Sequence, residues 1–526
     1  MKKLKRKGPA PVLTADEAMR LVPSGATLAI CGMGGGIVEP TALIEALARR
    51  FRETREPRDL TFFIPSGLGD RADRGVSPLA LTGLCRRAIS GCWGQSPRLA
   101  GMAEANEIEA YSFPLGVTTK LLRAAASGEP GILTHIGLGT HLDPRQTGGR
   151  LNERTREDLI RLMEIDGREW LFYPVTPIDV ALIRGSTADT EGCISMEDEI
   201  AFLDVLPMAQ AAHNNGGIVI AQVQRLVKAR TLHPKMVRVP GFLVDALVVV
   251  PEQEQLYCGS SRFMSGDYVA ELVEIAPSHL DVRKVIARRA LMEVQPGDVG
   301  NVGIGISDGI GVVAREEGVQ EDFTLTVELG TVGGLSAQGI FFGSSVNVQA
   351  VIDMPAQFDF YDGGGLDVGF LSFAEVDREG NVNVSLFNKK IMGVGGFVDI
   401  SSTTRKMVFS GTLTAGGLKT AVENGCVKIE QEGRFRKFLA RAAEISFNGR
   451  DALRRGQEVI YITERGVFRL TPEGLELFEI AAGMDLERDI AAHMEFRPKI
   501  SPDLKEMDRR LFRPESMGLR REWHRE

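Results

Sequence analysis

The sequence has few cysteines for its length, and none of them forms a metal-binding pattern. Six cysteines are scattered among 526 residues, with no C-x-x-C pair. Structural metal sites normally show such a pair, often beside histidines, so we expect no metal site. Scattered cysteines of this kind are typical of reduced core or loop residues, and we therefore expect a cytoplasmic protein.

Long apolar runs and an excess of positive charge are also absent. No run approaches the roughly 20 apolar residues that cross a bilayer, so we expect no membrane segment. No apolar segment follows the basic residues 1–7, which disfavours a signal peptide. We interpret them as a frayed, solvated tail rather than a nuclear or heparin-binding patch. The net charge of −8 disfavours a general nucleic-acid binder, and an anionic ligand would need a local basic pocket or a helix N-terminus.

Glycine, by contrast, is abundant. The 59 glycines cluster in short loops rather than in one repetitive tract. That distribution is typical of turns between strands and helices where the backbone must approach another group closely. Hydrophobic residues make up 43% and charged residues 25% of the chain, as in ordinary soluble proteins. Because 526 residues exceed what one core usually serves, we expect two or more domains.

One short stretch combines an apolar run, a single carboxylate and a cluster of glycines. Residues 323–327 are apolar or β-branched, Glu328 follows, and glycines are frequent over residues 330–334. This pattern predicts a buried strand that ends in a tight loop. Glu328 is then placed at the carboxyl end of a strand, where open α/β sheets bind ligands. The alternative is a solvated glutamate without a function.

The first part of the chain predicts the order helix, strand, glycine loop, helix, strand. Thr14 and Glu17 form a capping box at the start of the first helix. The elements are expected over residues 14–22, 26–30, 31–36, 40–52 and 60–64. This order indicates a βαβ unit with a parallel sheet. The glycine loop departs from G-x-G-x-x-G, and no acidic residue ends the next strand, so a loop that offers N–H groups to an oxyanion or phosphate is favoured over a nicotinamide site.

The same five elements are predicted again in the second half. They are expected over residues 281–294, 299–304, 303–305, 308–317 and 323–327. Gly25 and Gly297 lie 272 positions apart, and Gly67 and Gly330 lie 263 apart. The shared order favours duplication over a chance likeness of two βαβ units.

Only the second half carries the carboxylate, because Glu328 corresponds to Pro65 on the second offset. Residues 251–278, which have few long apolar runs, are the best candidate for a linker. The sequence therefore predicts an α/β protein of two related open domains, residues 1–270 and 279–526, with parallel-rich sheets and glycine loops.

The remaining segments give a coarser prediction. Glycine-rich loops are expected over residues 357–367 and 392–397. We also expect strands over residues 179–183, 218–223, 242–250, 406–409 and 458–462, a hairpin over 376–384, a helix over 485–494 and a charged tail at the surface.

Several of these stretches resemble motifs of the family I CoA-transferases, most closely the acetate/propionate branch fused into one chain. The motifs lie at residues 327–334, 358–367, 393–399 and 462–474, and residues 25–40 are similar to the family's N-terminal glycine loop. The resemblance covers roughly residues 10–500. It implies two related α/β halves, in agreement with the duplication.

The resemblance further implies that Glu328 is the nucleophile. In such enzymes a glutamate attacks an acyl-CoA thioester, giving a mixed anhydride and CoA thiolate. The thiolate then attacks the glutamyl carbonyl, leaving a glutamyl-CoA thioester and a free acid, and a second carboxylate reverses the steps. This covalent route splits one difficult exchange into easier ones. It needs neither a metal nor a permanently bound cofactor, because the CoA thioester is itself a substrate.

Other site residues and partners follow from the same resemblance. The oxyanion of each tetrahedral intermediate needs N–H donors. The candidate oxyanion or substrate-loop residues are Gly34, Gly35, Leu115, Gly395 and Gly396, and the candidate active-site loop is Asp362, Gly363 and Gly364. The expected partners are an acyl-CoA and a carboxylate, without nucleic acid or membrane, in a homo-oligomer (dimer or tetramer).

Two positions depart from the family's pattern. Leu115 stands where close relatives often have a glutamine, and Leu329 where a small polar residue is commoner. Leucine at both positions suggests a more apolar acyl site or a weakened enzyme. Two alternatives stay open, an acyl-CoA hydrolase on the same scaffold and a CoA-binding regulator without turnover, which the intact Glu328 disfavours.

Overall fold

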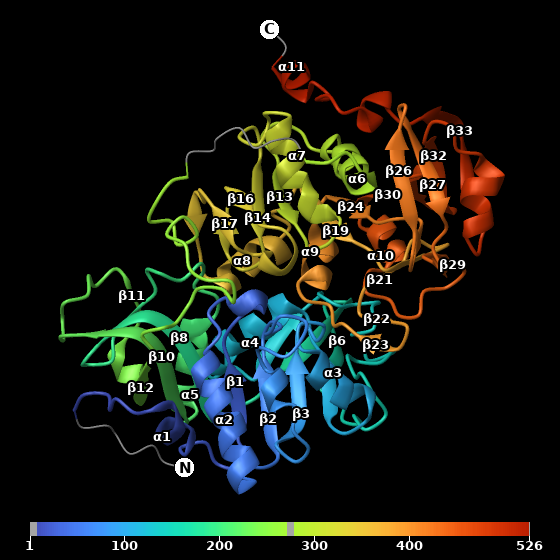
Figure 1. Ribbon diagram of the computed structural model, residues 1–526. Coiled ribbons are helices and arrows are strands. Elements are labelled where there is room, and N and C mark those ends of the chain that lie inside the picture. The colour runs from blue at the N-terminus through green and yellow to red at the C-terminus, as the bar shows by residue number, and fades with distance from the viewer. Residues whose placement is uncertain (1–7, 271–277, 525–526) are drawn as a thin grey trace.

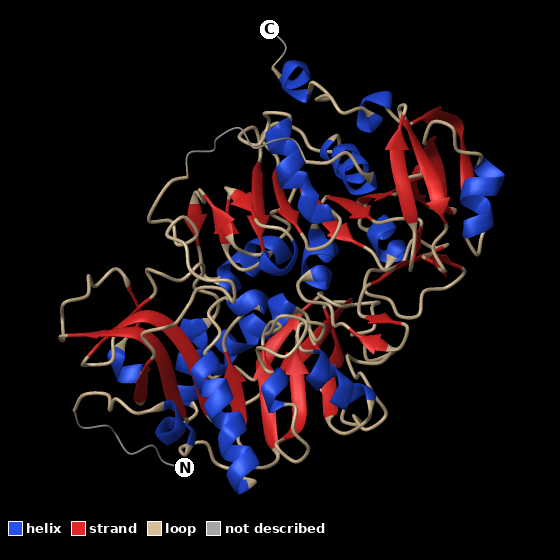
Figure 2. Ribbon diagram, viewed as in Figure 1, coloured by secondary structure: helices blue, strands red, loops and turns tan. Residues whose placement is uncertain are grey.

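The computed structural model describes residues 8–270 and 278–524, which form two halves, each built on its own sheet (Figure 1). The first half, blue to green, lies below the second, yellow to red, and strands and helices occur together in both (Figure 2). The predicted α/β architecture of two halves is confirmed. The predicted domain boundary between residues 270 and 279 stays a prediction, because residues 271–277 and the predicted tail of residues 1–7 lie outside the described residues.

The sheet of the first half has nine strands among the described residues. They are β1 (Thr27–Ile30), β2 (Leu60–Ile64), β3 (Cys85–Ser90), β4 (Glu109–Ser112), β8 (Val180–Asp189), β9 (Ile194–Ser195), β10 (Ile218–Val227), β11 (Val237–Val239) and β12 (Ala246–Val249). β2 is buried along its whole length, as expected for a strand of a parallel sheet covered on both faces.

The sheet of the second half has ten strands within the described part of the chain. They are β13 (Val299–Val302), β14 (Thr324–Val327), β15 (Thr331–Val332), β18 (Ala350–Val351), β19 (Val368–Ser372), β24 (Lys406–Ser410), β30 (Glu458–Ile462), β31 (Gly466–Thr471), β32 (Gly474–Ile480) and β33 (Lys499–Glu506). The predicted strands over residues 323–327, 406–409 and 458–462 are confirmed to within one residue.

Five parallel strands follow the same order in the two sheets. In the first half the order is β12-β10-β8-β1-β2, and in the second it is β30-β24-β19-β13-β14. Thr27 pairs with Thr61, and Val299 pairs with Thr324, which reproduces the two offsets read from the glycines. The element order and register therefore support the predicted duplication. Beyond β2 the sheet continues in parallel, whereas beyond β14 it turns antiparallel.

Helices connect these strands and lie beside them (Figure 2). They are α1 (Ala15–Met19), α2 (Thr41–Thr54), α3 (Pro97–Glu104), α4 (Leu115–Ser127), α5 (Val205–Asn214), α6 (Val282–Leu291), α7 (Ile310–Glu316), α8 (Met354–Asp362), α9 (Phe397–Thr403), α10 (Gly449–Arg454) and α11 (Leu519–Trp523). The capping box of α1 is confirmed, since Glu17 N–H donates to Thr14 Oγ1 and Thr14 N–H donates to the Glu17 carboxylate.

Smaller sheets complete both halves. Their strands are β5 (Gly131–Thr134), β6 (Arg161–Ile165), β7 (Arg168–Pro174), β16 (Leu335–Ser336), β17 (Ser345–Val346), β20 (Glu375–Asp377), β21 (Val382–Asn383), β22 (Leu386–Phe387), β23 (Lys390–Ile391), β25 (Thr414–Ala415), β26 (Lys419–Glu423), β27 (Cys426–Gln431), β28 (Phe435–Arg436) and β29 (Phe438–Leu439). β20 and β21 form the hairpin predicted over residues 376–384.

The loop predicted over residues 357–367 is wrong for most of its length. α8 occupies Met354–Asp362, and the chain turns only at Gly363 and Gly364, where Gly364 has a φ of +82°. Pro355 lies in the first turn of α8, where proline is favoured because its missing N–H has no helical partner. Phe358 and Tyr361 are buried three residues apart, so the helical spacing is visible in the sequence.

The carboxyl-terminal part also differs from the prediction. Residues 485–494 form a π-helical turn and a 3-10 turn rather than one α-helix. The tail includes β33, which pairs with β32, and Leu511 and Phe512 are buried. The tail therefore contributes to the sheet and core of the second half.

The halves share part of their hydrophobic core. One buried cluster belongs to the first half apart from Ile391, and another lies in the second half. A third contains residues of both, among them Met33, Leu115 and Phe358. The strand pair β22–β23 of the second half packs on α3 of the first, where Ile391 N–H donates to the Glu104 carboxylate. The halves are thus joined by continuous packing.

Candidate active site

A cavity of about 350 Å³ lies between the halves, at the carboxyl ends of strands from both sheets. Residues that follow β1, β2, β3, β13, β14 and β19 line it, including Gly34, Ser66, Cys92, Gly303, Glu328 and Phe373. Open α/β sheets bind ligands at this edge. Because both sheets present this edge to the cavity, the duplicated fold builds one site from two halves.

Glu328 occupies the centre of this arrangement at the end of β14. Its side chain lines the cavity and is partly exposed. Burial raises its pKa to about 7, and a hydrogen bond from the Gly396 N–H offsets only part of that effect. Burial disfavours the charged form of a carboxylate, whereas an N–H donor favours it. Glu328 is therefore a poorly solvated carboxylate with a backbone donor already directed at it.

The glycine loop before α9 approaches Glu328 so closely that a side chain would not fit. A Cβ on Gly396 would overlap Glu328 Oε2 and lie 3.1 Å from Phe358 Cζ. Gly395, with a φ of +51°, is held from two sides. Its N–H donates to the Gly91 carbonyl at 2.8 Å, and its carbonyl accepts from the Leu115 N–H at 2.9 Å. The first half therefore fixes a loop that belongs to the second.

The loop after β1 contributes one of its two candidate glycines to the cavity. Gly34 lines the cavity with Gln95 packed against it. The Gly35 N–H donates to the Gly69 carbonyl at 2.8 Å, and the Gly35 carbonyl accepts from the Tyr257 N–H at 2.9 Å. Both polar backbone groups of Gly35 are thus engaged away from the cavity. Gly35 is corrected from a candidate oxyanion donor to a support of the loop.

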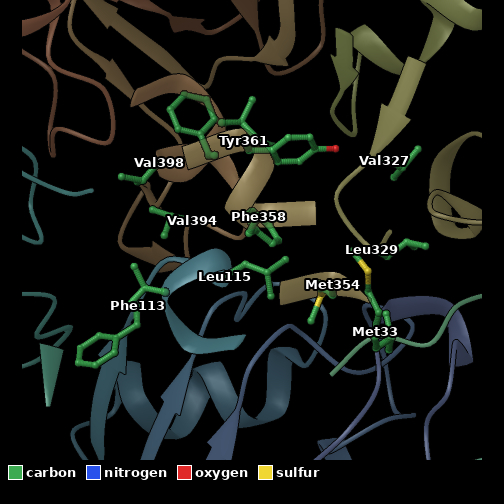
Figure 3. Close-up of a cluster of buried hydrophobic side chains, with 14 of the residues drawn as sticks. Met33, Phe113, Leu115, Val327, Leu329, Met354, Phe358, Tyr361, Val394 and Val398 are labelled. Atoms are coloured by element: carbon green, nitrogen blue, oxygen red, sulfur yellow. The ribbon is translucent and has the colours of Figure 1, made fainter. Parts of the chain in front are cut away.

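Leu115 does not line the cavity, contrary to its predicted place in the substrate loop. Its side chain is 1% exposed and lies in a buried hydrophobic cluster with Met354 and Phe358 (Figure 3). Leu329 is likewise buried, because it packs toward the core beside Gly343. The apolar acyl site expected from these two leucines is therefore not formed by them. Leu115 acts through its N–H on Gly395.

The candidate active-site loop of Asp362, Gly363 and Gly364 lines a different cavity, of about 470 Å³, together with His135 and Arg455. Asp362 forms an ion pair with Lys120. The family resemblance grouped these three residues with Glu328. The helical conformation of α8 carries them away, since Phe358 packs beside Gly396 and Asp362 lies a full turn further on.

Sequence reasoning missed most of the cavity wall. The wall is mainly apolar and includes Phe342, Leu371, Phe373, Val384, Met392, Phe397 and Ile400. Arg71 is exposed and also lines the cavity, and Cys92 lies near Glu328, whose charge contributes to the raised pKa of the thiol after burial. Phe373, Val384 and Met392 come directly after strands, and that position is the signal that could have identified them.

Two further properties concern the described residues as a whole. None of their helices has the length and apolar character needed to cross a membrane. The same ranges, 8–270 and 278–524, contain no group of three His, Cys, Asp or Glu side chains arranged to hold a metal ion.

Comparison with known proteins shows which family the chain is similar to. Residues 12–250 match the family model described as coenzyme A transferase. The chain is 56% identical over 514 residues to the acetate CoA-transferase YdiF of Escherichia coli (strain K12), with 97% of each chain covered. It is 40% identical over 522 residues to the caffeate CoA-transferase of Acetobacterium woodii, covering 97% of this chain and 99% of that one.

Solved structures agree with these relatives. The crystal structure of the acyl-CoA transferase YdiF apoenzyme from Escherichia coli O157:H7 has a TM-score of 0.94 and 55% identity, covering 98% of this chain and 99% of that one. A second structure of that protein, a thioester complex with CoA, has the same TM-score and coverage. Similarity of this extent includes both sheets and the cavity between them. The chain therefore belongs to the family I coenzyme A transferases and is a CoA-transferase with both halves fused in a single chain.

Proposed function

We propose that this CoA-transferase moves CoA from a short-chain acyl-CoA to a free carboxylic acid through a glutamyl-CoA thioester on Glu328. One observation carries the proposal. The Glu328 carboxylate lines the cavity between the halves close to Gly396, and burial raises its pKa to about 7. A poorly solvated carboxylate is a stronger nucleophile than a solvated one, and the carbonyl it becomes already has a donor for a developing oxyanion.

The proposed steps balance without another reactant. A Glu328 oxygen attacks the acyl carbonyl, the C–S bond breaks, and CoA leaves as a thiolate. The thiolate attacks the glutamyl carbonyl of the anhydride and expels the acyl group as a free carboxylate. A second carboxylate then attacks the glutamyl-CoA thioester, and the steps reverse. Gly396 is the proposed N–H donor to the oxyanion on the glutamyl carbon, and Gly34 lines the same cavity.

The apolar wall supports transfer rather than hydrolysis. Phe342, Phe373, Phe397 and Ile400 surround the space beside Glu328. Apolar walls exclude water from an activated thioester, and water is the competing acceptor. Arg71 is the proposed cation for the phosphates of CoA, since it is exposed on the same cavity and a guanidinium suits phosphate oxygens. The relative named for acetate supports a small carboxylate as acceptor.

The covalent intermediate gives the direct test. Incubated with acetyl-CoA and no acceptor acid, the enzyme should retain one CoA per chain, less one water, on the peptide that contains Glu328. Intact-protein and peptide mass spectrometry measure this adduct, and Glu328→Gln is the control that should lack it. An adduct that forms and then decays steadily to free CoA would instead indicate a hydrolase. A wild-type enzyme that transfers CoA without any adduct would exclude the mechanism.

The pH dependence should report the ionisation of Glu328. Because its pKa is raised to about 7 rather than 4.5, and only the carboxylate attacks, the rate of adduct formation should fall about tenfold per pH unit below pH 7. Quenched-flow mixing followed by mass spectrometry, from pH 5 to 9, measures this fall in the rate. Cys92→Ser is the matched control, since it removes the neighbouring thiol and should leave the pH dependence of the rate unchanged. A rate that falls only below about pH 4.5 would contradict the buried character of Glu328.

The cytoplasmic location and the homo-oligomeric state stay predictions.

A further inference from the structure

Three ionisable side chains from three helices meet behind the loop that carries Gly396. They are Lys120 on α4, Asp362 at the end of α8 and Asp399 in the first turn of α9. Lys120 and Asp362 form an ion pair with side chains 16% and 8% exposed, and Asp399 is fully buried. α4 belongs to the first half, whereas α8 and α9 belong to the second. The cluster thus lies where the halves join.

Asp399 is held by the amino end of α4. The Gly116 N–H donates to Asp399 Oδ2 at 3.2 Å, and the preceding N–H, of Leu115, donates to the Gly395 carbonyl at 2.9 Å. The first N–H groups of a helix have no partners within the helix, and the helix dipole favours acceptors there. Two consecutive N–H groups of α4 therefore bind both sides of Gly396, one residue before it and three residues after it.

The contact between α4 and α9 is tightly packed. A Cβ on Gly116 would overlap Asp399 Oδ1 and lie 2.5 Å from Phe358 Cδ1. Phe358 in turn packs beside Gly396, at 3.1 Å from the place of a Cβ there. Asp399 itself does not line the cavity with Glu328. Any influence of Asp399 on the reaction must therefore pass through the position of the loop.

The charges in the cluster favour a neutral Asp399. One ammonium group serves two carboxyl groups, and within the described residues neither Asp362 Oδ1 nor Asp399 Oδ1 has a hydrogen-bond partner. Burial, followed by the charge of Asp362, raises the pKa of Asp399 well above its usual range. Two nearby buried carboxyl groups do not both ionise. Asp399 accepts the Gly116 N–H with Oδ2, while Oδ1 has no hydrogen-bond partner within the described residues.

We propose that Asp399 is a positioning residue of the transfer reaction, which links α9 to the amino end of α4 and so holds the Gly396 N–H on the Glu328 carboxylate. The proposal rests on the proposed role of Glu328. It predicts that the residue must accept a hydrogen bond but need not be charged.

Two variants of Asp399 separate these requirements. Asp399→Asn keeps the shape and the acceptor for Gly116 and is never charged. Asp399→Leu keeps the branching at Cγ and is also neutral, but it is larger and leaves the Gly116 N–H without an acceptor. With acetyl-CoA and no acceptor acid, Asp399→Asn should form the Glu328 adduct within about threefold of the wild-type rate. Asp399→Leu should be about 10- to 100-fold slower, as expected when a donor shifts by up to about 1 Å.

Separate measurement of KM and kcat shows whether Asp399 acts by positioning the loop. Because Asp399 does not line the cavity, the KM for acetyl-CoA should change less than about threefold in both variants, whereas kcat should fall only in Asp399→Leu. Asp359→Ala is the matched control. It breaks the exposed Arg123–Asp359 ion pair (2.7 Å), which joins the same helices α4 and α8, and should retain the wild-type rate because exposed pairs contribute little.

The results overturn the proposal in two ways. A folded Asp399→Leu enzyme that forms the adduct at the wild-type rate would show that the contact is only structural, and an Asp399→Asn enzyme as slow as Asp399→Leu would show that the charge is needed. If Asp399→Leu does not fold, Asp399→Ala replaces it, since it makes no steric demand. A wild-type enzyme without any adduct would instead refute the role of Glu328, and steady-state transfer rates of the same variants would then test Asp399 alone.

Discussion

Replacement of Glu328 by glutamine should abolish CoA transfer and at the same time raise the thermal stability of the protein at pH 8. Activity is lost because an amide is a poor nucleophile and cannot form the acyl anhydride. Glu328→Asp should also lose about 100-fold or more, since one missing methylene withdraws the carboxylate by over an ångström. Steady-state transfer from acetyl-CoA to a carboxylate measures both losses.

The gain in stability follows from the direction of the pKa shift. The pKa of Glu328 is about 7 in the folded protein against an ordinary value of 4.5, so the folded state binds this proton more tightly. The stability that Glu328 contributes is complete below pH 4.5 and is lost as the pH rises through 7. At pH 8 the ionised side chain should therefore destabilise the fold by up to about 3 kcal/mol, a penalty that glutamine avoids.

The comparison between two pH values provides the control. Thermal unfolding of wild type and Glu328→Gln should differ by several degrees at pH 8, since about 1 kcal/mol shifts Tm by roughly 2–4 °C in large domains. At pH 4, where Glu328 is mostly protonated in both the folded and the unfolded wild type, the two midpoints should nearly coincide. A glutamine variant that is less stable than wild type at pH 8 would contradict the burial of a charged nucleophile. Retained transfer without deamidation of the glutamine would contradict the mechanism.

Gly396→Ala should reduce transfer more than 100-fold while leaving the fold intact. The φ of Gly396 is −84°, which alanine adopts without strain, so the effect does not arise from the backbone. It arises because the new Cβ would overlap Glu328 Oε2 and press on Phe358. Glu328 must then leave the Gly396 N–H, and a displacement of about 1 Å can cost ~100-fold in rate. Transfer rates and circular dichroism of the variant measure the two parts of this prediction.

Gly101→Ala is the matched control for Gly396→Ala. Gly101 lies within α3, and a Cβ there would meet nothing within 4 Å, so this variant should keep full activity and gain slightly in stability, as alanine usually does in helices. Adduct formation at the wild-type rate in Gly396→Ala would show that the close approach of this glycine to Glu328 has no part in catalysis.

The sequence predicted those helices and strands whose formation depends on neighbouring residues. The strand over residues 60–64 and the capping box of Thr14 and Glu17 were found where expected, because continuous apolar runs and cap chemistry are properties of neighbouring residues. The duplication was also visible, since both offsets recur in the register of the strands. α8 was missed because three glycines after it outweighed the proline and the apolar spacing within it.

The site residues that failed did so for reasons of tertiary structure. Gly35 resembles an oxyanion donor in sequence, but its N–H and carbonyl bind Gly69 and Tyr257. Leu115 was assigned to the substrate loop by the family resemblance, but its side chain is buried and only its N–H contacts the loop of Gly395. Which side of a loop faces a cavity depends on segments distant in the sequence, and spacing within one motif does not contain that information.

The loop at Gly395 is synthesised after the residues that hold it in place. Its backbone partners, Gly91 and Leu115, precede it in the chain by about three hundred residues, so they leave the ribosome long before Glu328 is made. Domains generally fold as units, the amino-terminal one first. The part of the first half that shapes the loop can thus be complete before the proposed nucleophile is synthesised. By the proposed mechanism, a nascent chain would form the CoA thioester only after its second half has docked on the first.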